Sequence, residues 1–433
     1  MKKYFFLSVL LAGLLMYMQV SEAEFSAVLK QEWAIDDRAN GQKFEVLFEP
    51  EWNLSLSDNL DMTIIGRVRW DGMDKLGSLT DNTKNFSSIN HALLSGSDGD
   101  VSIREWYVDT EAFGAFWRIG KQQVVWGQAD GLKVLDVVNP QSFREFILGD
   151  FANSRIPLWM LNVELPIKEA GSLQLLWIPD SSYNELAQAN TSYELSSSLL
   201  VPQLADGQIL TAFNRRKPSS IFSDSDFGLR YSTFYSGWDL TFNYMYHYLD
   251  SPVLYQNVIE QGLIIDSEYE RSHLIGASAS NAFGDFTLRT EVGYSTDTFN
   301  LSTDLNQSGI TKSADLSSVI GLDWQGLDDT LISIQWFYSH LFDYDNHVIR
   351  SQDNHILSFL YKQTFQNETW ELEVLELHGL DKDDGSIQVS VNYMLTSNVK
   401  AWIGTDVFYG NKTGLFGQFK NTDRITVGFE WGL

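Results

Sequence analysis

The feature that most constrains this chain is an alternation of apolar and polar residues over segments too long for a soluble sheet. Around residues 43–56, one face carries Phe44, Val46, Phe48, Trp52, Leu54 and Leu56. The other face carries Lys43, Glu45, Glu49, Glu51, Asn53 and Ser55. Strands of soluble sandwiches are about five or six residues long, whereas a tilted strand needs about nine to eleven residues to cross a bilayer. The segment therefore predicts a membrane-spanning strand with one lipid-facing side.

The same alternating unit recurs along the chain, and short connections between units alternate with long ones. A tight turn at 57–59 leads into the alternating run 60–71, and a turn at 235–237 leads into 238–248. Brief periplasmic turns and longer external loops are typical of an outer-membrane barrel. The long connections are predicted at about 36–42, 72–100, 123–157, 179–224, 250–268, 295–313, 341–354, 379–385 and 409–421.

The alternating segments add up to about eighteen strands, an even number as in bacterial barrels. About sixteen strands is the alternative, because residues 25–35 and 101–110 have ambiguous faces. The chain closes on the alternating apolar residues Ile425, Val427, Phe429, Trp431 and Leu433. This ending resembles the strand that the barrel-assembly machinery recognises, although Leu433 replaces the usual aromatic residue. We therefore predict an all-β fold, a transmembrane antiparallel β-barrel, over residues 24–433.

The first residues predict export. Lys2 and Lys3 precede an almost wholly apolar run over 4–20, and residues 21–23 offer small side chains for cleavage. This pattern predicts a cleaved signal peptide over 1–23. A retained anchor helix is the alternative, because the apolar run is about the minimum length that spans a membrane. A composition with 14 % aromatics and no cysteine fits an exported β-rich chain without disulfides, and we expect it in a Gram-negative outer membrane.

The net charge of -27 argues against nucleic acid as a partner, because nucleic-acid binding requires clustered lysine and arginine. Acidic external loops would repel anions and attract divalent cations; the simpler interpretation is that they keep the loops soluble. The acidic runs 97–100 and 381–384 lack the spacing of a calcium-binding loop, so solvated turns are expected there. No cofactor or metal is predicted, and outer-membrane lipid and lipopolysaccharide are the expected surroundings.

Because lipid-facing and lumen-facing positions alternate in a barrel, the charges that line the lumen can be named. The basic positions are Arg67, Arg69, Arg104, Arg118 and Arg230, and the acidic positions are Glu45, Glu49, Glu51, Glu371 and Glu373. Arg289 and Glu291 form a further pair of lumen positions. Opposed rings of basic and acidic side chains in a pore orient dipolar solutes and select among ions. The alternative is that these charges pair locally and hold a wet lumen rigid.

Residues 120–157 break the alternation. They are rich in Leu, Val and Phe without a period of two, and Gly127, Gly131, Pro140 and Gly149 interrupt any long helix. In water this segment would expose a large apolar patch. We therefore predict that the third external loop, 123–157, folds inward as a constriction or plug; a lid over the outer mouth is the alternative. The loop residues expected at the constriction are Trp126, Asp130, Asp136, Asn139, Arg144 and Arg155.

Several motifs resemble a family of proteobacterial outer-membrane proteins known as domain-of-unknown-function family 1302. They are KQQVVWGQADGLKVLDVVNPQSFREFILGDF, SRIPLWMLNVELP, DFGLRYSTFYSGWDLTFNYMYHYLDSP and QWFYSHLFDYD. The resemblance covers nearly the whole mature chain and implies an outer-membrane barrel. Some family members are encoded beside exporters of the resistance-nodulation-division type. This association implies an efflux-type exporter as a partner and lipidic or other hydrophobic molecules as cargo.

These observations predict a porin-like channel or transport protein that passes small or hydrophobic molecules across the outer membrane. The alternative is a surface scaffold without a conducting pore, which binds partners through loops such as 179–224. An outer-membrane lipid hydrolase is disfavoured, because consecutive strand residues face opposite sides and this separates Ser339 from His340. A zinc site from His340, Asp343 and His347 is disfavoured as well, and the protein is predicted not to be an enzyme.

Overall fold

The computed structural model describes residues 22–36, 38–73, 75–79, 85–129, 132–149, 151–167, 171–204, 209–260 and 262–433. The predicted signal peptide lies outside these residues, except for its last two positions, which begin the first strand. Among the described residues, no helix is long and apolar enough to cross a membrane.

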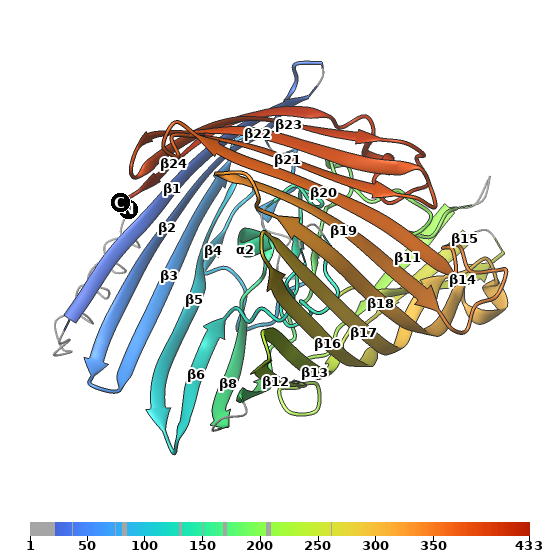
Figure 1. Ribbon diagram of the computed structural model, residues 1–433. Coiled ribbons are helices and arrows are strands. Elements are labelled where there is room, and N and C mark those ends of the chain that lie inside the picture. Colours follow the sequence, from blue (N-terminus) through green and yellow to red (C-terminus); the bar gives the residue numbers. More distant parts are fainter. Residues whose placement is uncertain are drawn as a thin grey trace, which may run out of the picture.

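Eighteen antiparallel strands close into a barrel (Figure 1). In chain order they are β1 (Glu22–Asp36), β2 (Gly41–Ser57), β3 (Leu60–Asp71), β5 (Gly99–Ala112), β6 (Ala115–Gln122), β8 (Leu158–Ile167), β9 (Gly171–Ile178), β12 (Asp226–Tyr235), β13 (Trp238–Tyr248), β16 (Arg271–Phe283), β17 (Phe286–Leu301), β18 (Ile310–Trp324), β19 (Thr330–Leu341), β20 (Asp353–Phe365), β21 (Trp370–Gly379), β22 (Asp384–Thr396), β23 (Val399–Tyr409) and β24 (Arg424–Gly432). The predicted strand number is confirmed and the sixteen-stranded alternative is wrong. The two ambiguous segments are β1 and β5.

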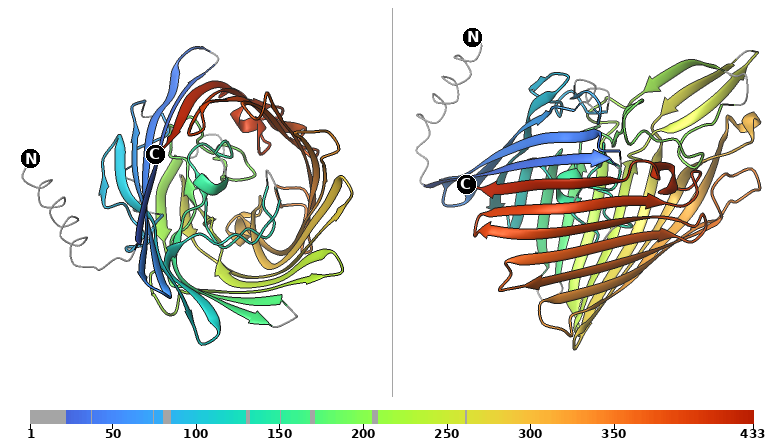
Figure 2. Two further views of the ribbon diagram at one scale, coloured as in Figure 1. Left: turned by 60° about the vertical axis from the view of Figure 1, so that its left-hand side comes forward. Right: turned by 90° about the horizontal axis from the view of Figure 1, so that it is seen from above.

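The barrel closes between its first and last strands. β1 pairs with β24 over the register from Asp36 opposite Arg424 to Val28 opposite Gly432. Ala27 and Leu433 extend the ladder by two backbone hydrogen bonds of 3.2 and 2.8 Å. Figure 2 shows the closed ring on its left side. We refer below to β24, β1 and β2 as the seam.

The two faces of each strand follow the alternation in the sequence. Apolar side chains such as Ile275, Ile334 and Ile403 point outward and stay 55–56 % exposed, as expected for residues that contact lipid. Small polar side chains on the opposite face are buried, and Ser333 and Gln335 flank Ile334 in this way. The barrel therefore has an apolar outer surface and a polar, filled interior.

The remaining elements lie in the long connections. They are β4 (Leu94–Ser95), β7 (Ser142–Phe143), α2 (Phe151–Ser154), β10 (Glu185–Leu186), β11 (Ile209–Arg216), β14 (Val253–Ile259), β15 (Gly262–Glu268), η2 (Leu305–Gln307) and η3 (Gly417–Phe419). β11, β15 and β14 form a separate three-stranded sheet that projects beyond the long-loop end of the barrel (Figure 2, right).

Two predicted loops are partly strand. Residues 250–268 contain the hairpin of β14 and β15, and β17 and β18 stay paired into the predicted loop 295–313, past a bulge between Ser295 and Thr298. The sequence prediction ended β17 and began β18 where apolar alternation stops. Backbone pairing needs no lipid-facing side chain, so the ladders continue outside the apolar band.

Candidate functional site in the barrel lumen

The segment 123–157 joins β6 to β8, and its described residues, all but 130, 131 and 150, lie inside the ring of strands (Figures 1 and 2). Near its start, Trp126 is fully buried and its indole Nε1 donates to the Gln174 side chain on β9 at 2.8 Å. The ring packs over Gly228 on β12, where an added Cβ would lie 2.9 Å from the Trp126 Cη2 atom. The absence of a side chain at Gly228 therefore makes room for this tryptophan at the wall.

The next part of the segment is held by β16 and β17. The Glu291 carboxylate accepts hydrogen bonds from the backbone N–H groups of Gln128 and, at 3.1 Å, of Leu135, while Arg289 donates to the Gln128 carbonyl. The Leu135 side chain fills a recess over Gly276, where an added Cβ would lie 2.3 Å from its Cδ2 atom. Wall and segment are therefore complementary in both hydrogen bonding and shape.

The tip of the segment is held by the seam. The Glu145 carboxylate lies 2.6 Å from Lys43 Nζ on β2 and 2.5 Å from Arg424 Nη1 on β24. Lys43 also contacts Glu32 on β1 at 2.9 Å, and Arg424 contacts Asp406 on β23 at 2.6 Å. All five side chains are at least four-fifths buried, so solvent screens these pairs weakly.

The neighbouring tip residue Arg144 adds a second ionic contact to the wall. Its guanidinium lies 3.5 Å from Glu45 on β2 and 3.9 Å from Asp71 on β3. Burial disfavours the charged form of Glu145, but Lys43 and Arg424 together outweigh this effect and hold the pKa of its carboxyl group well below the ordinary value. The tip therefore stays ionised and anchored at neutral pH.

These two anchor points lie on opposite sides of the barrel. Six strands, β18 to β23, separate β17 from β24. In the other direction eight strands, β3, β5, β6, β8, β9, β12, β13 and β16, separate β2 from β17. Contacts with both walls require the segment to cross the lumen.

The apolar side chains of the segment are covered by an aromatic cluster at the long-loop end. Phe146 lies with ring centroids 4.7 Å from Phe419, 6.2 Å from Phe416 and 6.2 Å from Phe408. Tyr193, from the connection between β9 and β12, completes the cluster at 5.7 Å from Phe419. Burying a large aromatic side chain contributes on the order of 2 kcal/mol. The cluster therefore shields Phe146, one of the apolar side chains of the segment, from water.

The two ends of the segment are tied to each other. The Asn139 side chain accepts from the Val124 N–H at 2.7 Å and donates to the carbonyls of Gln122 and Ile156 at 3.3 and 3.0 Å. Asp136 bridges Arg155 at 2.8 Å and Lys133 at 2.6 Å. These contacts join the beginning, middle and end of the segment, which is therefore folded on itself.

A cavity of about 100 Å³ beside the segment is rich in cations. Its basic lining residues are Arg67, Arg69, Arg104, Lys121 and Arg155, and its acidic ones are Asp100 and Glu185. Arg67 and Arg104 both contact the Glu49 carboxylate, at 2.8 and 3.5 Å, and Arg104 also donates to the Ala152 carbonyl at 2.6 Å. The lining itself therefore contains more basic than acidic side chains.

The other predicted lumen charges pair with close neighbours. Arg69 lies 2.9 Å from Asp100, and Arg118 lies 2.7 Å from Asp109 near the short-turn end. Glu371 and Glu373 contact Lys362 on the adjacent strand β20, at 2.9 and 3.5 Å. Glu51 accepts from Asn53, and Arg230 donates to the Val125 carbonyl of the segment at 3.1 Å. Asp130 lies outside the described residues.

Arg289 and Glu291 do not act as one pair. Arg289 contacts Asp323 on β18 at 2.9 Å, while Glu291 holds the segment backbone. Three residues that complete the seam contacts were not singled out from the sequence: Glu32, Asp406 and Arg424. Arg424 carried a usable signal, because it precedes Ile425 and so occupies a lumen-facing position of the last strand.

The residues weighed for hydrolase chemistry point to opposite sides of β19. The Ser339 hydroxyl lies 2.7 Å from both Asp315 Oδ2 and Arg350 Nη2. His340 instead contacts Asp353 through Nδ1 at 2.8 Å. Each of the two side chains therefore belongs to a separate polar contact.

Comparison with known proteins places the chain in a family. Residues 95–428 match the model of the protein family of unknown function DUF1302. This chain belongs to the DUF1302 family. The resemblance found in its motifs is thereby confirmed. A comparison with curated proteins gives no match.

Solved outer-membrane channels share the fold of this DUF1302 protein. OccAB2 of Acinetobacter baumannii matches with a TM-score of 0.56 at 10% identity, over 96% of this chain and 99% of that one. OpdK of Pseudomonas aeruginosa with vanillate matches with 0.51 at 10% identity, over 96% and 99%. OccK2 of Pseudomonas aeruginosa with glucuronate matches with 0.53 at 10% identity, over 96% and 98%. The likeness confirms a barrel of the outer-membrane type.

Proposed function

We propose that this protein is an outer-membrane channel whose conducting path is narrowed by the segment 123–157. The observation that carries the proposal is the course of the segment, from Glu291 on β17 to Lys43 and Arg424 at the seam. A chain that crosses a barrel lumen and is anchored on both walls limits what can pass, and its side chains are the ones that a passing solute meets.

The charge beside the segment favours small organic anions as solutes. Five basic side chains, among them Arg67 and Arg104, line the cavity beside the segment, against two acidic ones. The excess acidic charge of the chain opposes anion passage, but exposed loop charges are screened within about 8–10 Å at physiological ionic strength, whereas buried charges are screened much less. OpdK and OccK2, which share the fold, were solved with vanillate and glucuronate, both of which are carboxylates.

The test is single-channel conductance in planar bilayers. We expect the wild-type protein to conduct, and a variant lacking residues 132–149 to conduct more and to lose anion preference in its reversal potential. A control variant lacking residues 304–308, in the connection between β17 and β18, should conduct like the wild type. Unchanged conductance in the 132–149 deletion would overturn the constriction, and absent wild-type conductance would favour the surface scaffold.

A further inference from the structure

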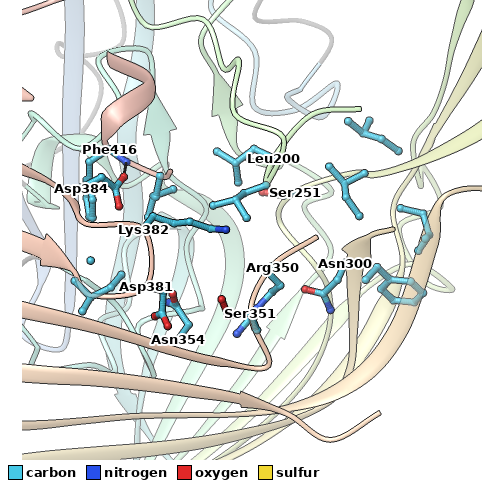
Figure 3. Close-up of a pocket in the computed structure, with 18 of the residues that line it drawn as sticks. Leu200, Ser251, Asn300, Arg350, Ser351, Asn354, Asp381, Lys382, Asp384 and Phe416 are labelled. Atoms are coloured by element: carbon cyan, nitrogen blue, oxygen red, sulfur yellow. Dashed lines mark hydrogen bonds between the residues drawn. The ribbon is translucent and has the colours of Figure 1, made fainter. Parts of the chain in front are cut away.

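A second, larger cavity lies at the long-loop end, outside the crossing segment (Figure 3). Its volume is about 370 Å³, within the range of about 300–1,000 Å³ that holds small organic ligands. The lining residues come from the connections after β9, β13, β19, β21 and β23 and from the ends of strands such as β17 and β18. A solute arriving from that end meets this cavity before the segment.

The cavity wall is mainly apolar. It is formed by Leu199, Leu200, Pro252, Val253, Leu254, Phe299, Leu301, Ile310, Ile356, Leu415 and Phe416. Such a wall favours an apolar body, since each methylene group removed from water contributes about 0.8 kcal/mol in transfer measurements. Phe416 is shared with the aromatic cluster around Phe146, so one side of the cavity rests on the crossing segment.

Most charged groups of the cavity are engaged by the protein. The Asp384 carboxylate accepts from the N–H groups of Phe416 and Gly417, at 2.6 and 2.9 Å. Asp381 accepts from the His355 N–H at 2.7 Å. Arg350 donates to the Ser339 hydroxyl at 2.7 Å and lies 3.4 Å from Asp315. These contacts leave the three side chains little freedom to bind a ligand.

Lys382 is different. Among the described residues it makes no hydrogen bond or ion pair, although its side chain is half-buried. Figure 3 shows its ammonium group reaching into the middle of the cavity, between Leu200 and Arg350. An ammonium group beside an apolar wall attracts an anion more strongly than one surrounded by water, because the apolar side chains screen the two charges less.

We propose that this cavity binds an organic carboxylate with an apolar body, with the carboxylate on Lys382 and the body against the wall around Leu200. This inference rests on the proposed channel function and names the solute class and its first binding site. A neutral analogue lacks the contact with Lys382, and a small carboxylate such as acetate lacks the contact with the wall. Both groups of the ligand are therefore needed.

The test is equilibrium binding of naphthoate, its neutral analogue naphthamide, and acetate to the full barrel in lipid nanodiscs. We expect wild type to bind naphthoate more tightly than either analogue. Lys382→Gln should weaken naphthoate binding about tenfold, as for loss of a hydrogen bond to a charged group, and should leave naphthamide unchanged. Lys382→Arg should retain the preference. Leu200→Ser should weaken both naphthyl ligands.

The matched control is Lys412→Gln, which removes an exposed cation from the connection between β23 and β24 outside the cavity and should bind like wild type. Equal binding of naphthoate to wild type and Lys382→Gln, or equal binding of naphthoate and naphthamide to wild type, would overturn the proposal. Conductance of the same purified proteins in planar bilayers separates the binding site from the channel function. If the barrel conducts but binds naphthoate no better than naphthamide, only the binding site is rejected. If the barrel binds naphthoate but does not conduct, only the channel function is rejected.

Discussion

The Glu145→Gln substitution tests the anchor between the crossing segment and the seam most directly. Glu145 is the only segment carboxylate among the described residues that contacts both Lys43 and Arg424, at 2.6 and 2.5 Å. Gln keeps the size of the side chain but removes the charge, and its single amide oxygen can accept from only one of the two cations. Lys43 and Arg424 then stay buried with one carboxylate fewer to neutralise their positive charges.

The size of the stability loss depends on the ion pairs that Lys43 and Arg424 keep in the variant. Removing one partner of a buried ion pair typically costs about 3–5 kcal/mol. Lys43 keeps Glu32 and Arg424 keeps Asp406, at 2.9 and 2.6 Å. We therefore expect the lower end, a loss of about 3 kcal/mol in the free energy of unfolding in urea. Conductance should rise in parallel, because the tip of the segment is released.

Two comparisons make the result interpretable. Glu368→Gln removes an exposed carboxylate from the turn between β20 and β21 and should change the free energy of unfolding by less than about 0.5 kcal/mol. Combining Glu145→Gln with Lys43→Met should recover part of the loss, since neighbouring charges couple by about 0.5–3 kcal/mol. Two results together would refute the anchoring role of Glu145. The Glu145→Gln protein would be as stable as wild type, and the double variant would lose a free energy of unfolding equal to the sum of the losses in the two single variants.

Three further predictions concern the same segment. The folded protein lowers the pKa of Glu145, so its stabilising contribution is present above the ordinary pKa of about 4.5 and is lost as the pH falls below that value. The difference between the urea midpoints at neutral and acidic pH should therefore be smaller in Glu145→Gln than in wild type. Gly276→Leu should fill the recess that holds Leu135, lowering the free energy of unfolding by about 1–3 kcal/mol and raising conductance. Asn139→Ala should leave backbone groups unpaired, cost about 1–3 kcal/mol and expose the segment to protease.

The barrel could be predicted from the sequence because consecutive residues of a strand point to opposite faces, whatever their distant partners are. A residue next to Ile334 must face the lumen whatever its partners are, so strand faces and the order of short and long connections follow directly. The strand number was confirmed for the same reason. The predicted loop 295–313 was too long, because the ladder between β17 and β18 continues to Leu301 and Ile310. The connection 250–268 lies between β13 and β16 as predicted, but its hairpin of β14 and β15 was not predicted.

The partners of the crossing segment could not be predicted in the same way. Periodicity gives the face of a side chain but neither its height in the barrel nor its position around the ring. Arg424 meets Glu145 across 279 positions of sequence, and Leu135 meets Glu291 across 156. Such contacts depend on the closed ring. The composition of the segment predicts an inward fold, and the alternation places Arg144 and Glu45 among the expected site residues, but neither identifies which side chains meet.

The seam contact also has a consequence for assembly. Lys43 belongs to the second strand and Arg424 to the last, and the Glu145 carboxylate lies between them. This carboxylate can hold both cations only after β24 has paired with β1 and brought the two ends of the sheet together. The segment therefore docks fully as one of the last events of folding, and an unfinished barrel lacks its internal crossing. Protease resistance of residues 123–157 therefore reports whether β1 and β24 have paired and closed the barrel.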